Sequence, residues 1–249
     1  MRLLPIIFFL FLFIACKKAE NKTITAQQII DKTIENAGGP NYEVATINFT
    51  FRSIKYSSKR KNGNFELSRT FTDSIGEIND VLNNIEFTRF VNAQKINLHD
   101  STATKYSNSV NSVLYFVQLP YGLNAPAVKK ELVGEAEIEG NEYYEVQVTF
   151  GEKGGGTDHE DVYMYWIAKE GFTVDYFAYK FYTDEGGIRF RKAYNPRKIS
   201  GLRFVDYENY KLEPWKQVDL KTVDELFEAG KLKLLSDIKT EDITVELSN

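Results

Sequence analysis

The run Asp158–Asp161, which reads DHED, is the densest group of side chains in this sequence that could do chemistry. Carboxylates and imidazole bind zinc, and a metal ion held there could assist hydrolysis. His159 and Glu160 begin like the HExxH motif, but Tyr163 occupies the position of its second histidine. Neighbouring strand residues point to opposite faces, so at most two of the four could share a site. We therefore expect no metal site, and keep a metal-assisted hydrolase as an alternative function.

Two arginines in the segment GGIRFRKAYNPR have the spacing to bind an anion together. Arg189 and Arg191 lie two positions apart, so on a strand they share one face. Paired guanidinium groups can bind a carboxylate or phosphate head group through parallel hydrogen bonds. The same arginines could instead form ion pairs across neighbouring strands, with Asp161, Asp206 or Glu208. The sequence leaves both interpretations open.

Motifs for covalent or nucleotide chemistry are absent from the sequence. Gly154–Gly156 lacks the Lys-Ser/Thr of a phosphate-binding loop, and the Gly-Gly pairs lack dinucleotide-binding spacing. No G-x-S-x-G elbow presents a nucleophilic serine. A net charge of −4 without a broad basic face disfavours nucleic-acid binding. We expect no catalytic residue and no cofactor, which inclines the prediction away from an enzyme without excluding one.

The single cysteine, Cys16, has the sequence context of a lipid attachment site. Residues 1–15 combine Met1-Arg2 with an apolar run shorter than the ~20 residues of a membrane-spanning helix, so they predict a signal peptide. Ala15 directly before Cys16 resembles the bacterial lipobox. That resemblance implies cleavage before Cys16 and acylation of its thiol and amine, with palmitate among the acyl groups. A free thiol after an ordinary signal and an uncleaved anchor are the alternatives.

An acylated Cys16 would place the protein in the cell envelope. Each buried methylene contributes ~0.8 kcal/mol, so two or three acyl chains hold a protein firmly at a membrane. Residues 16–24 would be a lipidated tether, and residues 25–249 a single folded domain that needs no disulfide. We expect a lipid-anchored protein, of the outer membrane, facing the periplasm or the surface. The sequence names no protein partner.

The periodicity of the apolar residues predicts one helix followed by antiparallel strands. Thr25 and Gln28 have capping-box spacing, and an apolar stripe then recurs at helical spacing as far as Gly38–Pro40. From Ala45 onward apolar and polar residues alternate, as in strands with one buried face, and the Asn62-Gly63 pair predicts a hairpin turn. Further strand-like runs lie near residues 85–98, 130–139, 142–150, 161–168, 172–183, 187–194, 202–211 and 240–247.

Short helices are otherwise expected only at Ser109–Gly122, with a loop, and at Thr222–Ala229. About ten antiparallel strands without intervening helices exclude parallel α/β folds, and the aromatic share of 14% also favours β-sheet. The predicted fold class is mainly β (α+β). We expect a curved antiparallel sheet, or incomplete barrel, wrapped around the N-terminal helix, which would bury the aromatic face of the sheet.

Aromatic residues crowd two of the predicted strands on both faces, so both faces should be at least partly covered. A large core would explain them, but a cavity between sheet and helix is the usual form of an apolar ligand site. Residues 114–117 and 119–122 could form a lid over its mouth. The candidate ligand-binding residues are Phe49, Phe51, Phe71, Tyr163, Tyr165, Trp166, Phe177, Tyr179, Arg189 and Arg191.

The leader, the helix that ends in Gly-Gly and the long antiparallel strands together resemble the LolA/LppX-like envelope proteins. That resemblance covers most of residues 25–249 and implies an incomplete barrel that wraps a helix and holds acyl chains. The segments DVYMYW, GGIRFRKAYNPR and RFVDYENY are more closely similar to an uncharacterised lipoprotein family of Bacteroidota-type envelopes, which implies secretion.

The leading hypothesis is a non-catalytic envelope lipoprotein that binds a lipid-like or other apolar small molecule between sheet and helix. The alternatives are the metal-assisted hydrolase, with the arginine pair as an anion clamp, and an interaction or assembly module of the envelope. A cavity lined by Phe and Tyr would favour the first. Convergence of His159 with carboxylates would favour the second, and a filled interior with a flat apolar outer patch the third.

Overall fold

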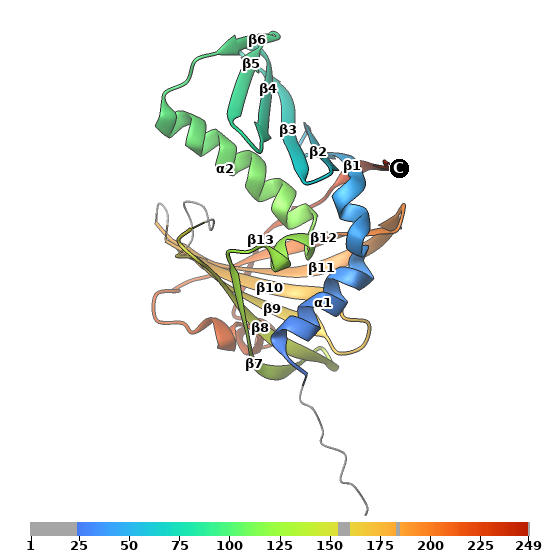
Figure 1. Cartoon of the computed structure of the whole chain (residues 1–249). Coiled ribbons are helices and arrows are strands. Elements are labelled where there is room, and N and C mark those ends of the chain that lie inside the picture. The colour runs from blue at the N-terminus through green and yellow to red at the C-terminus, as the bar shows by residue number, and fades with distance from the viewer. Residues whose placement is uncertain (1–23, 154–159, 183–184, 249) are drawn as a thin grey trace, which may run out of the picture.

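The computed structural model describes residues 24–153, 160–182 and 185–248 and arranges their strands in two open antiparallel sheets (Figure 1). Sheet A has the strand order β14-β1-β2-β3-β4-β5-β6, and sheet B the order β13-β12-β11-β10-β9-β8-β7. The predicted mainly β, antiparallel and unclosed fold class is confirmed, with two sheets in place of one. The predicted signal peptide and Cys16 lie outside the described residues, and the single domain at 25–249 stays a prediction.

Neighbours in sequence are mostly neighbours in space within each sheet. The strands of sheet A are β1 (Ala45–Phe51), β2 (Ile54–Lys61), β3 (Asn64–Asp73), β4 (Gly76–Asn83), β5 (Phe87–Val91), β6 (Gln94–Ile96) and β14 (Glu241–Leu247). The strands of sheet B are β7 (Val128–Ile138), β8 (Asn141–Phe150), β9 (Val162–Ala168), β10 (Val174–Phe181), β11 (Gly187–Ile199), β12 (Leu202–Leu212) and β13 (Lys233–Ile238). The chain therefore passes from sheet A to sheet B after β6 and returns between β13 and β14.

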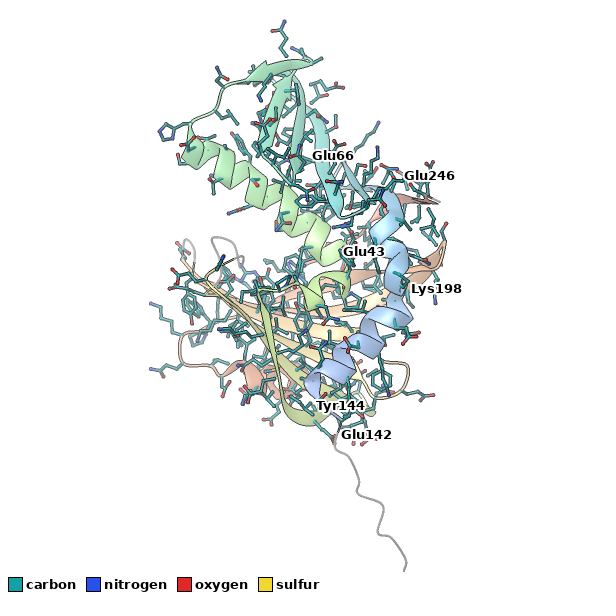
Figure 2. All side chains as sticks on the ribbon, in the orientation of Figure 1. Glu43, Glu66, Glu142, Tyr144, Lys198 and Glu246 are labelled. Atoms are coloured by element: carbon teal, nitrogen blue, oxygen red, sulfur yellow. The ribbon has the colours of Figure 1, made fainter. Side chains whose placement is uncertain are left out.

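Local sequence signals on sheet A act as predicted. The Asn62-Gly63 turn joins β2 and β3, with positive φ at both residues. Glu66 and Glu246 alternate with apolar neighbours along their strands and are exposed (Figure 2). Strand alternation thus separates a charged outer face from an inner face that packs against a helix.

The N-terminal helix α1 (Ala26–Ala37) begins and ends where the sequence predicts. The Thr25 hydroxyl accepts a hydrogen bond from the Gln28 backbone N–H, and the Gln28 side chain accepts one from the Thr25 N–H. Gly38 ends the helix with φ +138°, a value that a side chain would strain, and η1 (Gly39–Val44) leads into β1. The fully buried Ile29 and Ile30 pack on sheet B, on the side that we call its inner face.

A second helix, α2 (Asp100–Val117), is much longer than the helix predicted from Ser109. Its first half is rich in Ser, Thr and Asn, which are weak helix formers, so the sequence pattern conceals it. The helix lies along β3, β4 and β5, and its C-terminal end reaches sheet B (Figure 1), after which η2 (Tyr121–Asn124) leads to β7. The expectation of a single enclosed helix is therefore corrected, because α1 and α2 share the inner face of sheet B. Among the described residues, no helix is long and apolar enough to span a membrane.

A buried carboxylate holds α2 on sheet A. Asp80 of β4 is fully buried and accepts hydrogen bonds from Arg69 at 2.8 Å and from Arg89 at 2.6 and 2.8 Å. Arg69 also donates to the Ser109 hydroxyl of α2 at 2.7 Å. The Arg89 guanidinium lies 3.5 Å from the ring centroid of Tyr106, a cation–π contact with the same helix. The first half of α2 is thus held largely by charge rather than by apolar burial.

The strands differ from the prediction where a charge or a turn breaks the alternation. The run 85–98 is two strands, because Asn92 and its neighbour have positive φ and turn the chain. The alternation rule misses β4, because the charged Asp80 occupies an inward position. It misses β13 because Leu234 and Leu235 are adjacent, which breaks the alternation of apolar and polar residues. Both leucines are about half exposed. The described residues therefore form fourteen strands rather than about ten.

Both faces of sheet B are covered, as its aromatic pattern predicts. The outer face packs against the segment between β12 and β13, which contains η3 (Leu220–Thr222) and α3 (Val223–Glu228). Trp166 and Phe190 are fully buried there, with ring centroids 5.6 Å apart. The helix expected at Thr222–Ala229 is confirmed.

We expect the substitution Asp80→Asn to lower the free energy of unfolding by about 3–5 kcal/mol, because it leaves two buried guanidinium groups without a counter-charge. Equilibrium urea denaturation measures the change. Glu86→Gln is the control, since Glu86 pairs with Lys95 at an exposed site, and such pairs contribute at most ~1 kcal/mol. Equal effects of the two substitutions would contradict the role assigned to Asp80.

Candidate functional site

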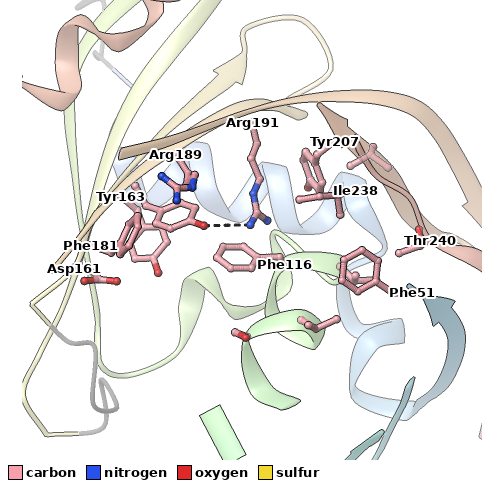
Figure 3. Close-up of a pocket in the computed structure, with 15 residues that line it drawn as sticks. Phe51, Phe116, Asp161, Tyr163, Phe181, Arg189, Arg191, Tyr207, Ile238 and Thr240 are labelled. Carbon is pink, nitrogen blue, oxygen red and sulfur yellow. Dashed lines mark hydrogen bonds between the residues drawn. The ribbon is translucent and has the colours of Figure 1, made fainter. Parts of the chain in front are cut away.

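A cavity of about 380 Å³ lies between the inner face of sheet B and the C-terminal half of α2 (Figure 3). Its volume is that of a small-molecule site. Ten of the fifteen residues that line it are aromatic or aliphatic, and the rest are polar or charged. The lining residues are Phe51, Ser112, Val113, Phe116, Val117, Asp161, Tyr163, Tyr179, Phe181, Arg189, Arg191, Val205, Tyr207, Ile238 and Thr240.

Stacked aromatic rings form one wall of the cavity. Tyr163 of β9 and Tyr179 of β10 are cross-strand partners with ring centroids 5.4 Å apart. Phe116 of α2 stacks on Tyr179 at 5.6 Å and on Phe177 at 5.5 Å. The helix thus contributes a ring to the same stack as the sheet, which ties the position of α2 to the shape of the cavity.

Arg191 of β11 projects from the sheet toward Phe116 (Figure 3) and is only 9% exposed. Its guanidinium carbon lies 4.3 Å from the Phe116 ring centroid, and its Nη2 donates a hydrogen bond of 3.2 Å to the Tyr179 hydroxyl. Its Nε is buried without a hydrogen-bond partner. Burial without a counter-charge is costly for an ionised group. Arg191 is therefore buried but only partly satisfied by the described residues.

Arg189 lies on the same face of β11 and lines the same cavity, as the spacing predicts. Its Nη1 donates to the carbonyl of Ile188 at 3.2 Å, and its guanidinium carbon lies 5.0 Å from the Phe181 ring centroid. Within residues 24–153, 160–182 and 185–248, no carboxylate forms an ion pair with Arg189 or Arg191. The two guanidinium groups therefore give the apolar cavity a cationic wall.

The alternative pairing of these arginines with Asp206 or Glu208 is wrong. The Asp206 carboxylate accepts hydrogen bonds of 2.7 and 2.8 Å from Arg197 and one of 3.0 Å from the Thr240 backbone N–H. Burial alone would raise the pKa of Asp206, but these hydrogen bonds and one from Asn195 lower it below its usual value. Glu208 accepts a hydrogen bond from a tyrosine hydroxyl instead. A bulge in β11 before Arg197 brings that arginine to Asp206.

The candidate ligand-binding residues divide by their place in the fold. Those that line the cavity are Phe51, Tyr163, Tyr179, Arg189 and Arg191. Tyr165 and Phe177 share the inner face but belong to the core beside α1. Phe49 lies in the core of sheet A, Phe71 lies beside Arg69 there, and Trp166 lies on the outer face of sheet B. The sequence identified the aromatic strands correctly, but it did not show which of their aromatic residues line the cavity.

Several lining residues were not among the candidates. Phe181 continues the two-residue period of Phe177 and Tyr179, so that pattern could have identified it. Val113 and Phe116 have helical spacing, and Phe116 falls in the predicted lid at residues 114–117. Ile238 and Thr240 enter the cavity through the crossing between the sheets, for which the sequence carries no local signal.

The described residues include only part of the predicted metal cluster. Among the described residues, no three His, Cys, Asp or Glu side chains come together as metal ligands. Asp158 and His159 of the predicted cluster lie outside those residues. Asp161 is described and lines the cavity.

Burial keeps Tyr207 of β12 neutral. It raises the pKa of Tyr207 to about 12, against a smaller lowering by Arg203 and Arg191. Tyr207 therefore contributes no charge to the cavity wall at neutral pH. The formal charges on the described wall are then the guanidinium groups of Arg189 and Arg191 and the carboxylate of Asp161.

Comparisons with known proteins give one family match. The model of a family of unknown function, DUF6503, matches residues 5–240. No curated protein matches the chain. The predicted Bacteroidota-type origin stays a prediction, since the family description names no group of organisms.

Several solved structures have a similar course of the chain, and three of them are compared with it in turn. A LolA superfamily protein from Nitrosomonas europaea is 16% identical, with 91% of this chain and 95% of that chain covered and a TM-score of 0.49. A DUF1329 family protein from Desulfovibrio piger is 13% identical, with the same coverage and a TM-score of 0.45. A putative outer membrane lipoprotein-sorting protein domain from Vibrio parahaemolyticus is 8% identical, with 89% and 92% covered and a TM-score of 0.46. These scores lie below 0.5, so we infer function from the geometry of this chain.

We expect Arg191→Met to raise the free energy of unfolding by about 1–2 kcal/mol, because it replaces a buried, unpaired charge with an apolar side chain of similar length. Arg89→Met is the matched control: Arg89 is also 9% exposed, but it binds Asp80. That substitution should lower the free energy of unfolding by about 3–5 kcal/mol. Urea denaturation measures both, and a loss of stability in Arg191→Met as large as in the control would contradict the assignment.

Proposed function

The chain belongs to the family of unknown function DUF6503, and from its geometry we propose a non-catalytic envelope lipoprotein that binds a lipid-like or other apolar molecule. The observation that carries the proposal is the cavity of about 380 Å³ between sheet B and α2. A concave, mostly apolar site with a few polar groups is the usual form of a small-molecule binding site.

The energetics of the cavity favour a ligand with a hydrocarbon part. Each methylene removed from water contributes about 0.8 kcal/mol, so about ten methylenes contribute about 8 kcal/mol before the cost of association is subtracted. The rings of Phe51, Phe116 and Phe181 offer that burial on three sides, since they come from β1, α2 and β10. Filling the cavity would also remove water from the stacked tyrosines.

Metal-assisted hydrolysis remains the second candidate because of one observation. Asp161, the last residue of the predicted metal cluster, lies on the wall of the same cavity as Arg189 and Arg191. A metal ion bound there would act next to a cationic anion clamp. Mass spectrometry of the intact native protein separates the candidates, since a stoichiometric metal would favour the hydrolase and a bound lipid the carrier.

The proposed location follows from Cys16. Its acylation would anchor the protein in the envelope, at the outer membrane, with the folded part in the aqueous phase facing the periplasm or the surface. A tether of about eight residues separates Cys16 from the N-cap Thr25, which leaves the cavity free to exchange ligand with a membrane surface or a soluble donor.

We expect protein that begins at Lys17, which keeps every described residue, to retain co-purified lipid in native mass spectrometry. Val113→Trp should reduce the lipid-bound fraction about tenfold or more, because the indole fills the cavity beside Phe116. Asn111→Trp is the control, since Asn111 is exposed on the same helix and does not line the cavity. An empty cavity in both wild type and control, with no uptake of added lipid, would refute the proposal.

We expect Cys16→Ser in the full-length chain to abolish incorporation of labelled palmitate and to prevent cleavage of the leader, because acylation requires the thiol. Electrophoresis of labelled cells and intact mass spectrometry measure both effects. Substitution of Ser57, a serine on β2 far from the leader in sequence, by alanine should change neither. Palmitate labelling that survives in Cys16→Ser would exclude the lipid anchor.

A further inference from the structure

We propose that the ligand of this cavity is an amphiphile with an anionic head, a carboxylate or a phosphate, and that Arg191, assisted by Arg189, binds that head. The inference rests on the proposed function and specifies the class of its ligand. Arg191 is a buried and only partly hydrogen-bonded cation in a cavity that is otherwise mostly apolar.

Arg191 differs from the other buried arginines of the described chain. Arg69, Arg89 and Arg191 are 8–9% exposed, and the first two bind the buried Asp80. Arg191 has no carboxylate partner among the described residues and donates one hydrogen bond, to a tyrosine hydroxyl. A guanidinium group carries five N–H donors, so most of the capacity of Arg191 is unused. For Arg69 and Arg89 the fold itself supplies the anion. Here the anion is left to the ligand.

The surroundings of Arg191 hold its guanidinium group in place. Phe116 lies under the guanidinium at 4.3 Å, and the Phe177 and Tyr179 ring centroids lie 5.2 and 5.5 Å away. The Tyr179 hydroxyl accepts from Nη2. Nη1 makes no hydrogen bond within the described residues and so remains available to an incoming oxygen. Stacking and a single hydrogen bond fix the plane, which is the preorganisation that anion recognition requires.

The distribution of charge and apolar surface gives the ligand a direction. Asp161 lies on the same side of Arg191 as Arg189, while Phe51 and Ile238 lie on the other side (Figure 3). A hydrocarbon chain would extend along Phe51 and Ile238, with its head at Arg191. A neutral hydrocarbon would complete the burial of the guanidinium without pairing it, which is unfavourable. A small anion alone would leave the aromatic walls in contact with water.

The test measures binding of four probes to protein that begins at Lys17. The probes are hexadecanoate, hexadecyl phosphate, hexadecanol and inorganic phosphate, each in competition with a fluorescent fatty chain or by calorimetry. We expect one or both anionic amphiphiles to bind wild type about 10- to 100-fold more tightly than hexadecanol, since charge-assisted hydrogen bonds contribute that much. The tighter of the two identifies the head as carboxylate or phosphate. Inorganic phosphate should not compete at the same concentration.

Arg191→Met should abolish the preference for anions while leaving the affinity for hexadecanol within about threefold of wild type. Arg191→Lys, which keeps the charge, should retain part of the preference. The matched control is Lys192→Met: Lys192 is the next residue, but it points to the opposite face and binds Glu139 at 2.6 and 2.8 Å, so its loss should change no affinity. A thermal melt of each variant establishes that it is folded.

The outcomes separate this inference from the proposed function. Equal affinity of wild type for hexadecanol and the anionic amphiphiles, or an anion preference that survives in Arg191→Met, would overturn the inference alone. Competition by inorganic phosphate as strong as by the amphiphiles would overturn it too, because the hydrocarbon part of the ligand would then contribute nothing to binding. Failure of every probe to bind would overturn the proposed function with it.

Discussion

A charged group buried among aromatic rings without a counter-ion is the constraint on which this account depends. Arg191 occupies the inner face of sheet B because alternation along β11 places it there, and Phe116 of α2 covers it. The carboxylate of Asp206, which could have paired with it, is bound by Arg197 instead. The fold thus surrounds the guanidinium of Arg191 with aromatic rings, but its described part provides no anion for it.

Two buried carboxylates, by contrast, have their charge satisfied by arginines of the same protein. Asp80 binds two arginines that in turn hold the first half of α2 on sheet A. Asp206 binds Arg197 and the Thr240 backbone, at the point where the chain crosses from sheet B to β14 of sheet A. These two carboxylates position α2 and the crossing segment. Helix α2 and the crossing segment in turn contribute residues to the cavity wall. The site therefore depends on polar contacts remote from it, as well as on the apolar core beneath α1.

The sequence predicted the parts of this arrangement that local patterns determine. The capping box of α1, the Asn62-Gly63 turn, the common face of Arg189 and Arg191 and the two covered faces of sheet B all follow from spacing and residue type. The division into two sheets does not, because contacts of Thr240 and Asp206, far apart in sequence, decide where the chain crosses. For that reason Phe49 and Phe71 could not be separated from Phe51, although only Phe51 reaches the cavity. The polar first half of α2 was missed because charge holds it in place, and apolar periodicity does not report charge.

The most direct test of the central claim is a crystal structure of the protein with a long-chain carboxylate bound. The account predicts that the chain lies between sheet B and α2 along Phe51 and Ile238, with a carboxylate oxygen within hydrogen-bond distance of an Nη atom of Arg191. A structure with the carboxylate in solvent and Arg191 still unpaired, or with the chain bound outside this cavity, would contradict it.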